Sequence, residues 1–273
     1  MVVVSYGGGV NTIAMLVLLK RRGIVPYAIV MSDPGHEWPK TYEYRDRVMQ
    51  PWLLRVGFPK VVVVNREEEA KFRPRSQHVG TLGDECMRLR NLPSIAYGYK
   101  KCSIKYKIDP FIWYMERQSW AQAEWNEGRL ISRGVGYDRG EERRVKKSLS
   151  GGGEDRFYKP FFPLYEEGLY REDCEKLIES EKLPPPPKSA CIFCPHNQYE
   201  EWLELRDKHP EEFNYAVKLS RSAEVDVPDV VGLMRCNPHG KRQLHVWADG
   251  GYDEQDLDKG TGIEEGKPCG CGD

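Results

Sequence analysis

Short apolar runs alternate with amphipathic segments along the first quarter of the chain. Val2–Ser5, Pro26–Ser32 and Lys60–Val64 are apolar on both faces, which predicts buried strands. The intervening segments, Ile13–Arg22 and Pro39–Arg55, predict helices. Strands of this kind that alternate with helices are typical of a parallel sheet with helices on both faces. We therefore expect an α/β fold with a doubly wound, mostly parallel sheet.

The later segments predict one more strand, several helices and irregular connections. Leu130–Gly136 has the pattern of a strand, and the Gly-rich segment Lys146–Asp155 predicts a flexible loop. Pro184–Pro187 predicts a rigid linker. Helices are expected over Asp109–Glu124, Tyr170–Lys182, Gln198–Lys208 and Glu211–Glu224, and a hairpin is expected over Val230–Arg235 with Leu244–Ala248.

The composition is that of a globular protein in water. Of 273 residues, 40% are hydrophobic and 30% are charged, and no apolar run is long enough to cross a membrane. We therefore expect no membrane partner and a cytoplasmic location. The net charge is -1, but basic residues concentrate in 71–107 and 129–147. These segments predict either a solvated face or a surface for the phosphates of a nucleotide or a nucleic acid.

A glycine-rich turn follows the first expected strand. Ser5 and Tyr6 lead into Gly7-Gly8-Gly9, and Asn11 and Thr12 stand at the start of the next helix. Backbone N–H groups and the positive end of the helix dipole point outward together at such a turn, which favours phosphate binding. A tight strand-to-helix connection without a ligand is the alternative. The pattern fits neither a Walker A loop nor GxGxxG.

Six short motifs follow one another along the chain, namely Gly7–Thr12, Asp33–Tyr44, Lys101–Pro110, Gly134–Arg144, Tyr158–Leu164 and Cys191–Pro195. In type and order they resemble the motifs of the PP-loop superfamily, specifically its branch similar to phosphoadenosine phosphosulfate (PAPS) reductase, within the adenine nucleotide α-hydrolase fold. The resemblance spans residues 1 to about 200. It implies a Rossmann-like sheet of the PP-loop type.

The resemblance implies a site for an adenine nucleotide, either ATP or PAPS. The residues expected to bind it are Ser5, Tyr6, Gly7, Gly8, Gly9, Asn11, Thr12, Asp33, Glu37, Arg133, Gly134, Arg139, Arg143 and Arg144. Arginines bind phosphate through two parallel hydrogen bonds, although an exposed surface position is the alternative for these four. Within the motif that contains Lys101, we expect Lys105 to be catalytic.

Three positions depart from the pattern of the family members that cleave ATP. Gly7 and Thr12 stand where those members have Ser, and Asn11 stands where they have Asp. Asn11 lacks the charge that would help to hold Mg²⁺, so Mg²⁺ is only a possible cofactor. Sulfonucleotide reductases also lack that Asp. Their Glu-Cys-Gly-x-His tail is missing here, however, and Gly266–Asp273 is the nearest match.

The eight cysteines are expected to be reduced in the cytosol, which favours metal binding or redox chemistry over disulfides. Cys191-x-x-Cys194 has a metal-ligand spacing, although a dithiol or two buried thiols would also fit it. The resemblance to reductases that contain a [4Fe–4S] cluster implies Cys102, Cys191 and Cys194 as ligands, but Lys101 stands where those reductases have a further Cys. We expect Cys86, which lies just upstream, to be the fourth ligand. A structural Zn²⁺ with His196 as a ligand is the alternative.

Two cysteines near the end of the chain are candidate catalytic thiols. Cys269 and Cys271 lie in a polar, Gly-rich tail, which is either a disordered end or a mobile carrier of a reactive thiol. Cys174, in an expected helix, is interpreted as a core thiol, and Cys236 likewise.

The expected domain organisation follows the motifs. Residues 1–183 form the nucleotide-binding α/β domain, in which 65–128 is a basic insertion that contains cysteines. Residues 184–248 carry the C-x-x-C segment, helices and hairpin, and 249–273 form an acidic, flexible tail.

Three functions are consistent with these observations. The first is an enzyme that activates a nucleobase or nucleic acid (tRNA or DNA) with ATP and transfers sulfur to it with help from an iron–sulfur cluster. A sulfur donor protein would then be a partner. The second is a PAPS or adenylylsulfate reductase that produces sulfite with a thiol carrier. The third is a non-catalytic nucleotide-binding subunit with structural zinc.

Overall fold

The computed structural model describes residues 1–73, 80–99, 101–150, 156–226, 232–234 and 243–250. The strands are β1 (Val2–Ser5), β2 (Ala28–Asp33), β3 (Val61–Asn65), β4 (Ile131–Gly134) and β5 (Tyr158–Phe161). The α-helices are α1 (Val10–Arg21), α2 (Pro39–Tyr44), α3 (Gln50–Arg55), α4 (Arg66–Ala70), α5 (Leu82–Leu89), α6 (Lys101–Ser103), α7 (Asp109–Glu116), α8 (Ser119–Asn126), α9 (Glu142–Ser150), α10 (Pro163–Glu166), α11 (Arg171–Ser180), α12 (Tyr199–Lys208), α13 (Pro210–Asp226) and α14 (Leu244–Ala248). Shorter helical segments are η1 (Arg45–Met49), η2 (Ser94–Tyr97), η3 (Ile104–Ile108) and η4 (Arg139–Glu141).

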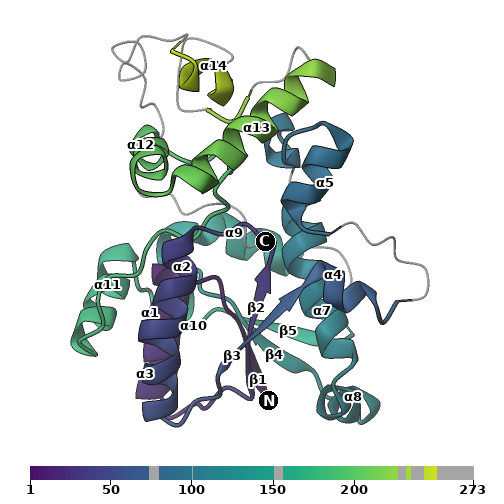
Figure 1. The fold of residues 1–273 in the computed structure, drawn as a ribbon. Helices are drawn as coiled ribbons and strands as arrows, with labels where there is room; N and C mark the ends of the chain where they lie inside the picture. The colour runs from purple at the N-terminus through teal and green to yellow at the C-terminus, as the bar shows by residue number, and fades with distance from the viewer. Residues whose placement is uncertain (74–79, 100, 151–155, 227–231, 235–242, 251–273) are drawn as a thin grey trace.

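The five strands form one parallel sheet in the order β3-β2-β1-β4-β5 (Figure 1). β1 is central, because Val4 pairs with Ile29 of β2 on one side and with Gly134 of β4 on the other. The chain proceeds outward from β1 to β3, and then crosses to the other side of β1 for β4 and β5. This arrangement confirms the predicted α/β fold with a doubly wound parallel sheet.

Helices cover both faces of the sheet, because successive side chains of a strand point to opposite sides. Val4 and Ile29 pack with α1, α3 and α11 on one face. Val3 and Val30 pack with α7 and α8 on the other face. Figure 1 shows the first group of helices to the left of the sheet and the second group to the right. The sheet is therefore the middle of three layers.

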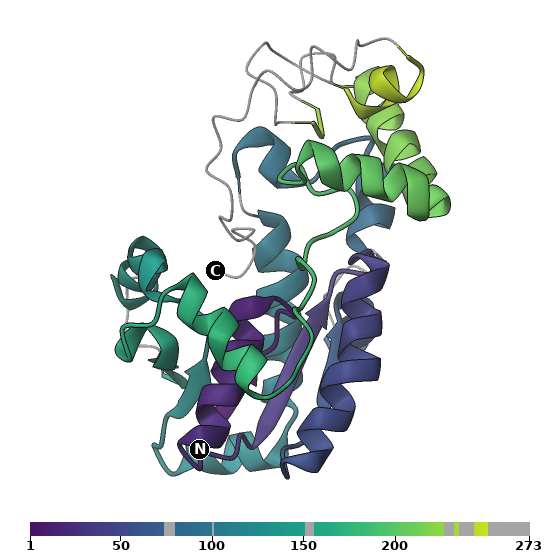
Figure 2. The ribbon, with the colours of Figure 1, turned by 90° about the vertical axis from the view of Figure 1, so that its left-hand side faces the viewer.

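A second hydrophobic cluster lies beyond the carboxyl edge of the sheet. It combines α5 and Tyr106 from the middle of the chain with residues 190–194, α12, α13 and α14. Figures 1 and 2 show α5 and α12–α14 together at the end of the molecule away from the N-terminus. Trp202 and Phe193 are fully buried within the cluster. The cysteine-containing insertion and the C-x-x-C segment therefore share one core.

Two predicted irregular or extended segments are helical instead. α9 continues to Ser150, so the loop predicted from Lys146 is wrong for 146–150, and 151–155 lie outside the described residues. Burial of Val145 and a Lys146–Glu142 ion pair one turn apart stabilise the helix there.

The hairpin predicted over 230–235 and 244–248 is also wrong in its second arm, because 244–248 form α14. Trp247 packs against Tyr199 of α12 and Phe213 of α13, with ring centroids 5.8 Å apart in both pairs. This tertiary packing overrides the strand preference of the short apolar segment. Half of the first arm, residues 230, 231 and 235, lies outside the described residues.

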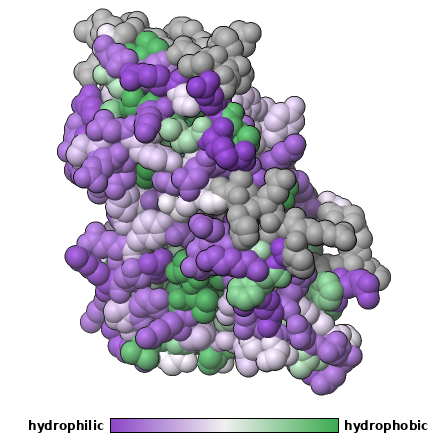
Figure 3. All heavy atoms as spheres, turned by 45° about the vertical axis from the view of Figure 1, so that its right-hand side comes forward, coloured by the Kyte–Doolittle hydropathy of each residue, from purple (hydrophilic) through white to green (hydrophobic). Residues whose placement is uncertain are grey.

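The outer surface is mixed in polarity. Figure 3 shows a face on which hydrophilic side chains predominate and hydrophobic ones occupy smaller areas. Within the described ranges, none of the helices combines the length and the hydropathy that crossing a bilayer requires.

Candidate functional site

The glycine turn and the segment after β4 flank the point where the strand order reverses. β1 and β4 are neighbours in the sheet although they are far apart in the sequence. In open α/β sheets, ligands bind beside the carboxyl ends of the strands at such a point. Residues 6–9 follow β1 there, and residues 135–141 follow β4. The topology therefore brings two of the predicted motifs to one edge.

The glycine turn presents backbone donors at the start of α1. Gly8 has a positive φ of 78°, and no side chain caps α1, whose N-cap residue is Gly9. The N–H of Gly7 donates to the Thr12 hydroxyl at 3.3 Å. Among the described residues, none accepts a hydrogen bond from the N–H of Gly8 or Gly9. These donors, together with the N-terminus of a 12-residue helix, make the turn suitable for an anion.

Side chains close the space around Gly8. A Cβ at Gly8 would lie 3.0 Å from Thr41 Cγ2 and 3.6 Å from Tyr6 Cε1. Tyr6 is buried, which raises the pKa of its phenol well above the usual value, and Tyr44 adds to this shift. Thr41 is 1% exposed, and in the described part of the chain its hydroxyl has no hydrogen-bond partner. A side chain at Gly8 would therefore fit only if Thr41 moved.

Asn11 ties the glycine turn to the segment after β4. Its amide nitrogen donates to Asp138 Oδ2 at 3.0 Å and to Glu141 Oε2 at 2.7 Å. The backbones also touch there, because a Cβ at Gly136 would lie 2.7 Å from the carbonyl carbon of Asn11. Neither carboxylate was among the predicted site residues. Together they form a capping box at the start of η4. An Asp-x-x-Glu pattern at a helix start was the available signal.

The four predicted arginines lie near this edge in different settings. Arg133 donates to the Ser5 hydroxyl at 2.9 Å, and its guanidinium lies 4.2 Å from the ring centroid of Phe111. Arg139 and Arg144 lie over tyrosine rings, and Arg144 also forms an ion pair with Glu141. Arg143 is exposed. Arg133 therefore lies within β4, whereas Arg139, Arg143 and Arg144 follow it, and the phosphate contacts of all four remain a prediction.

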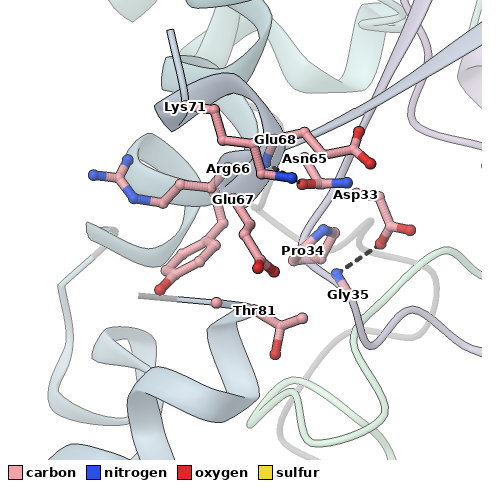
Figure 4. A pocket seen from close by; sticks show the side chains of 11 residues that line it. Asp33, Pro34, Gly35, Asn65, Arg66, Glu67, Glu68, Lys71 and Thr81 are labelled. Carbon is pink, nitrogen blue, oxygen red and sulfur yellow. Dashed lines mark hydrogen bonds between the residues drawn. The ribbon is translucent and has the colours of Figure 1, made fainter. Parts of the chain in front are cut away.

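Asp33 ends β2 beside a polar cavity of about 240 Å³. Its Oδ1 accepts hydrogen bonds of 2.7 Å from the Gly35 N–H and from the Tyr42 hydroxyl. Burial, and after it the charge of Asp33, raises the pKa of Tyr42. Figure 4 shows acidic and basic side chains, among them Glu67 and Lys71, around the cavity. Its lining suits a ligand that has both hydrogen-bond donors and acceptors.

Glu37 joins three parts of the chain inside the protein. Its side chain is 2% exposed, and it accepts from Lys107 Nζ at 3.0 Å and from the Ser189 hydroxyl at 3.1 Å. The backbones beside it are paired, because the Ile192 N–H donates to the His36 carbonyl at 2.9 Å. Glu37 was predicted to bind nucleotide. In the structure it connects the segment after β2 to the C-x-x-C segment.

This arrangement predicts a stabilising role for Glu37. Glu37→Gln is expected to lower the free energy of unfolding by about 2 kcal/mol, since it removes the charge that pairs with Lys107 in a buried setting. Urea unfolding measures the change. Glu43→Gln is the control, because Glu43 pairs with Arg47 at the surface and such pairs contribute less than about 1 kcal/mol. Equal, small effects of the two substitutions would contradict the role.

Lys105, the predicted catalytic lysine, is engaged with Glu85. Its ammonium group forms an ion pair with that carboxylate, which also accepts from the Tyr106 hydroxyl. Burial alone would raise the pKa of Glu85, but the hydrogen bonds from Lys105 and Tyr106 bring that pKa below its usual range. Glu85 precedes Cys86, so this ion pair lies beside one of the predicted metal ligands.

The four predicted metal ligands belong to the second hydrophobic cluster. Cys86, Cys191 and Cys194 are buried in it, and the half-buried Cys102 packs against it. Burial, followed by the charges of Glu85 and Cys102, raises the pKa of Cys86. As the side chains are placed in the described residues, no three His, Cys, Asp or Glu groups converge as a metal site. The structure thus places the four thiols in or against one hydrophobic cluster, which we call the cysteine core. As the described side chains are placed, no three of them converge as metal ligands.

The other cysteines lie elsewhere. Cys174 is buried in the core beside α1, as predicted, and burial raises the pKa of its thiol to about 12. Cys236, Cys269 and Cys271 lie outside the described residues. The predicted catalytic role of the two tail thiols therefore stays a prediction.

Comparisons with known proteins identify a similar solved structure but no matching family. No family model and no curated protein matches the chain. Among solved structures, it is similar to the U34-tRNA thiolase NcsA from Methanococcus maripaludis with its [4Fe-4S] cluster. The TM-score is 0.41 at 17% identity, over 82% of this chain and 72% of the thiolase.

Proposed function

We propose that the protein binds the phosphates of an adenine nucleotide at the glycine turn and transfers sulfur to a nucleobase or nucleic acid in an ATP-dependent reaction. The structure of the glycine turn is the main support for this proposal. It combines the positive φ of Gly8, N–H groups without acceptors among the described residues, and an uncapped helix of 12 residues. It also lies at the reversal point of the sheet. The PP-loop resemblance of the sequence supports the choice of an adenine nucleotide.

The ligand atoms that the cysteine core offers are thiol sulfurs, which suit an iron–sulfur cluster. Four thiols that lie in or against one hydrophobic cluster are the groups that such clusters of iron and sulfur use as ligands. Cys86, Cys102, Cys191 and Cys194 would hold it. When bound, the cluster would supply the site at which sulfur is delivered.

Residues of this chain would bind the nucleotide and stabilise the charge that develops in the reaction. The backbone of the glycine turn would hold the pyrophosphate that leaves when an acceptor oxygen attacks the α-phosphate of ATP. Arg139, Arg143 and Arg144 would stabilise negative charge that develops on that phosphate. Sulfide from the donor protein would then attack the activated carbon and form a C–S bond, while the C–O bond breaks and AMP leaves with that oxygen. The basic segments 71–107 and 129–147 would provide the surface for the nucleic acid.

The hydrogen-bonded segments beside Glu37 support sulfur transfer between the cysteine core and a nucleotide site at the sheet edge. The segment that starts at Asp33, on the sheet edge, hydrogen-bonds directly to the C-x-x-C segment through His36 and Ile192. A nucleotide bound at this edge would therefore be separated from the cysteine core by one short segment, which runs from Asp33 to His36.

Pyrophosphate release tests this function. We expect release from ATP only when an acceptor nucleic acid is present, and deletion of Pro268–Asp273 should change it little, since sulfur arrives from a donor protein. A PAPS or adenylylsulfate reductase would behave differently. It would release sulfite with a thiol carrier and without ATP, and Cys269→Ser or Cys271→Ser would cost nearly all activity. Sulfite release of this kind would overturn the proposal.

A further inference from the structure

The junction of α1 with the segment after β4 is built around one neutral side chain. Asn11 directs the two hydrogens of its amide to different carboxylates, Asp138 at 3.0 Å and Glu141 at 2.7 Å. All three residues are buried, with 5–8% of their surface exposed. Two carboxylates that converge on one point inside a protein need a compensating group there.

The junction already holds more carboxylates than guanidinium groups when Asn11 is neutral. Arg144 forms an ion pair with Glu141. Arg171 donates to the side-chain oxygen Oδ1 of Asn11 at 3.4 Å, but its guanidinium also forms an ion pair with Glu175. The Cys174 thiol is a further titratable neighbour, and its pKa is raised by burial and by the charge of Asp138. A negative charge at position 11 would increase this excess of carboxylates.

We infer that Asn11 is a positioning residue whose amide group takes the place that a divalent cation would occupy between Asp138 and Glu141. Mg²⁺ and Ca²⁺ bind converging carboxylate oxygens at about 2.0–2.6 Å, and the amide nitrogen lies where the two oxygens meet. The amide holds the segment after β4 against the first turn of α1. This inference rests on the proposed anion site. It implies that the glycine turn binds its phosphate without a metal ion at this point.

Thermal unfolding with metal ions alone tests the inference. In the wild-type protein without nucleotide, we expect the same Tm in EDTA, Mg²⁺ and Ca²⁺. Asn11→Asp places three carboxylates together, so its Tm in EDTA should fall by about 5 °C or more and recover when either cation is added. Asn11→Ala is the control, since it loses the hydrogen bonds but adds no charge. Its Tm should fall without recovery.

An exchange of the two side chains provides a second variant. In Asn11→Asp combined with Asp138→Asn, the amide donor moves to position 138. The Oδ1 atom there can still accept the Gly140 N–H, which now donates to Asp138 at 2.8 Å. The three side chains at positions 11, 138 and 141 again comprise one amide and two carboxylates, although the carboxylate at position 11 still faces Glu141. We expect the exchange to be more stable in EDTA than Asn11→Asp and to respond less to metal.

Three results would overturn the inference. These are a cation-dependent Tm in the wild type, no cation response in Asn11→Asp, or an exchange variant no more stable in EDTA than Asn11→Asp. Failure of the proposed function is distinguishable, because the Tm measurements contain no nucleotide. ATP and PAPS that do not bind, measured by calorimetry, would contradict the anion site and leave the cation results unchanged.

Discussion

Replacing Gly8 with valine is expected to abolish binding of ATP and PAPS. The backbone of Gly8 has a φ of 78°, which a β-branched residue adopts only with strain. The new Cβ would also lie 3.0 Å from Thr41 Cγ2, and its methyl groups would extend into the space that the phosphate needs. We expect an affinity at least about 100-fold weaker, equivalent to about 2.7 kcal/mol, by calorimetry.

Gly23→Val is the matched control for this experiment. Gly23 also has a positive φ, of 66°, but it follows the opposite end of α1, and nothing lies within 4 Å of its Cβ position. The control therefore carries similar backbone strain without blocking the turn, and its nucleotide affinity should stay unchanged. Thermal unfolding of both variants confirms that they are folded. Unchanged affinity of Gly8→Val would refute the assignment of the turn.

Anaerobically purified protein is expected to be brown and to contain about four irons per chain. Cys86→Ser and Cys191→Ser should lose most of this iron, because both thiols are buried in the cysteine core and serine is a poor cluster ligand. Metal analysis and absorption spectra measure the loss. Cys174→Ser is the control, since Cys174 is equally buried but packs beside α1 in a different cluster.

The metal content also separates the alternatives. One tightly bound zinc without iron would contradict the cluster and favour a structural metal. Full iron retention in Cys86→Ser, with loss in Cys191→Ser, would keep the cluster but remove Cys86 from its ligands. Iron loss in Cys174→Ser equal to that in Cys191→Ser would show that the losses report on folding.

The sequence by itself determined the fold class and the position of the glycine turn. Runs such as Val61–Val64 are apolar on both faces, and helices alternate with them, so local patterns already specify a parallel sheet. A sheet of that kind brings the carboxyl ends of its strands to one edge. The turn after β1 and the segment after β4 could therefore be assigned to one site before their contacts were known.

Only the tertiary structure decided which partners the predicted site residues have. Asn11 contacts Asp138 and Glu141 across more than 120 positions of the sequence, and Glu37 contacts Ser189 across 152. No local pattern encodes such pairs, because they depend on how the layers pack. The same holds for 244–248, which was predicted as a strand but packs as a helix against α12 and α13. Periodicity specifies which side of an element is buried, whereas packing specifies what it is buried against.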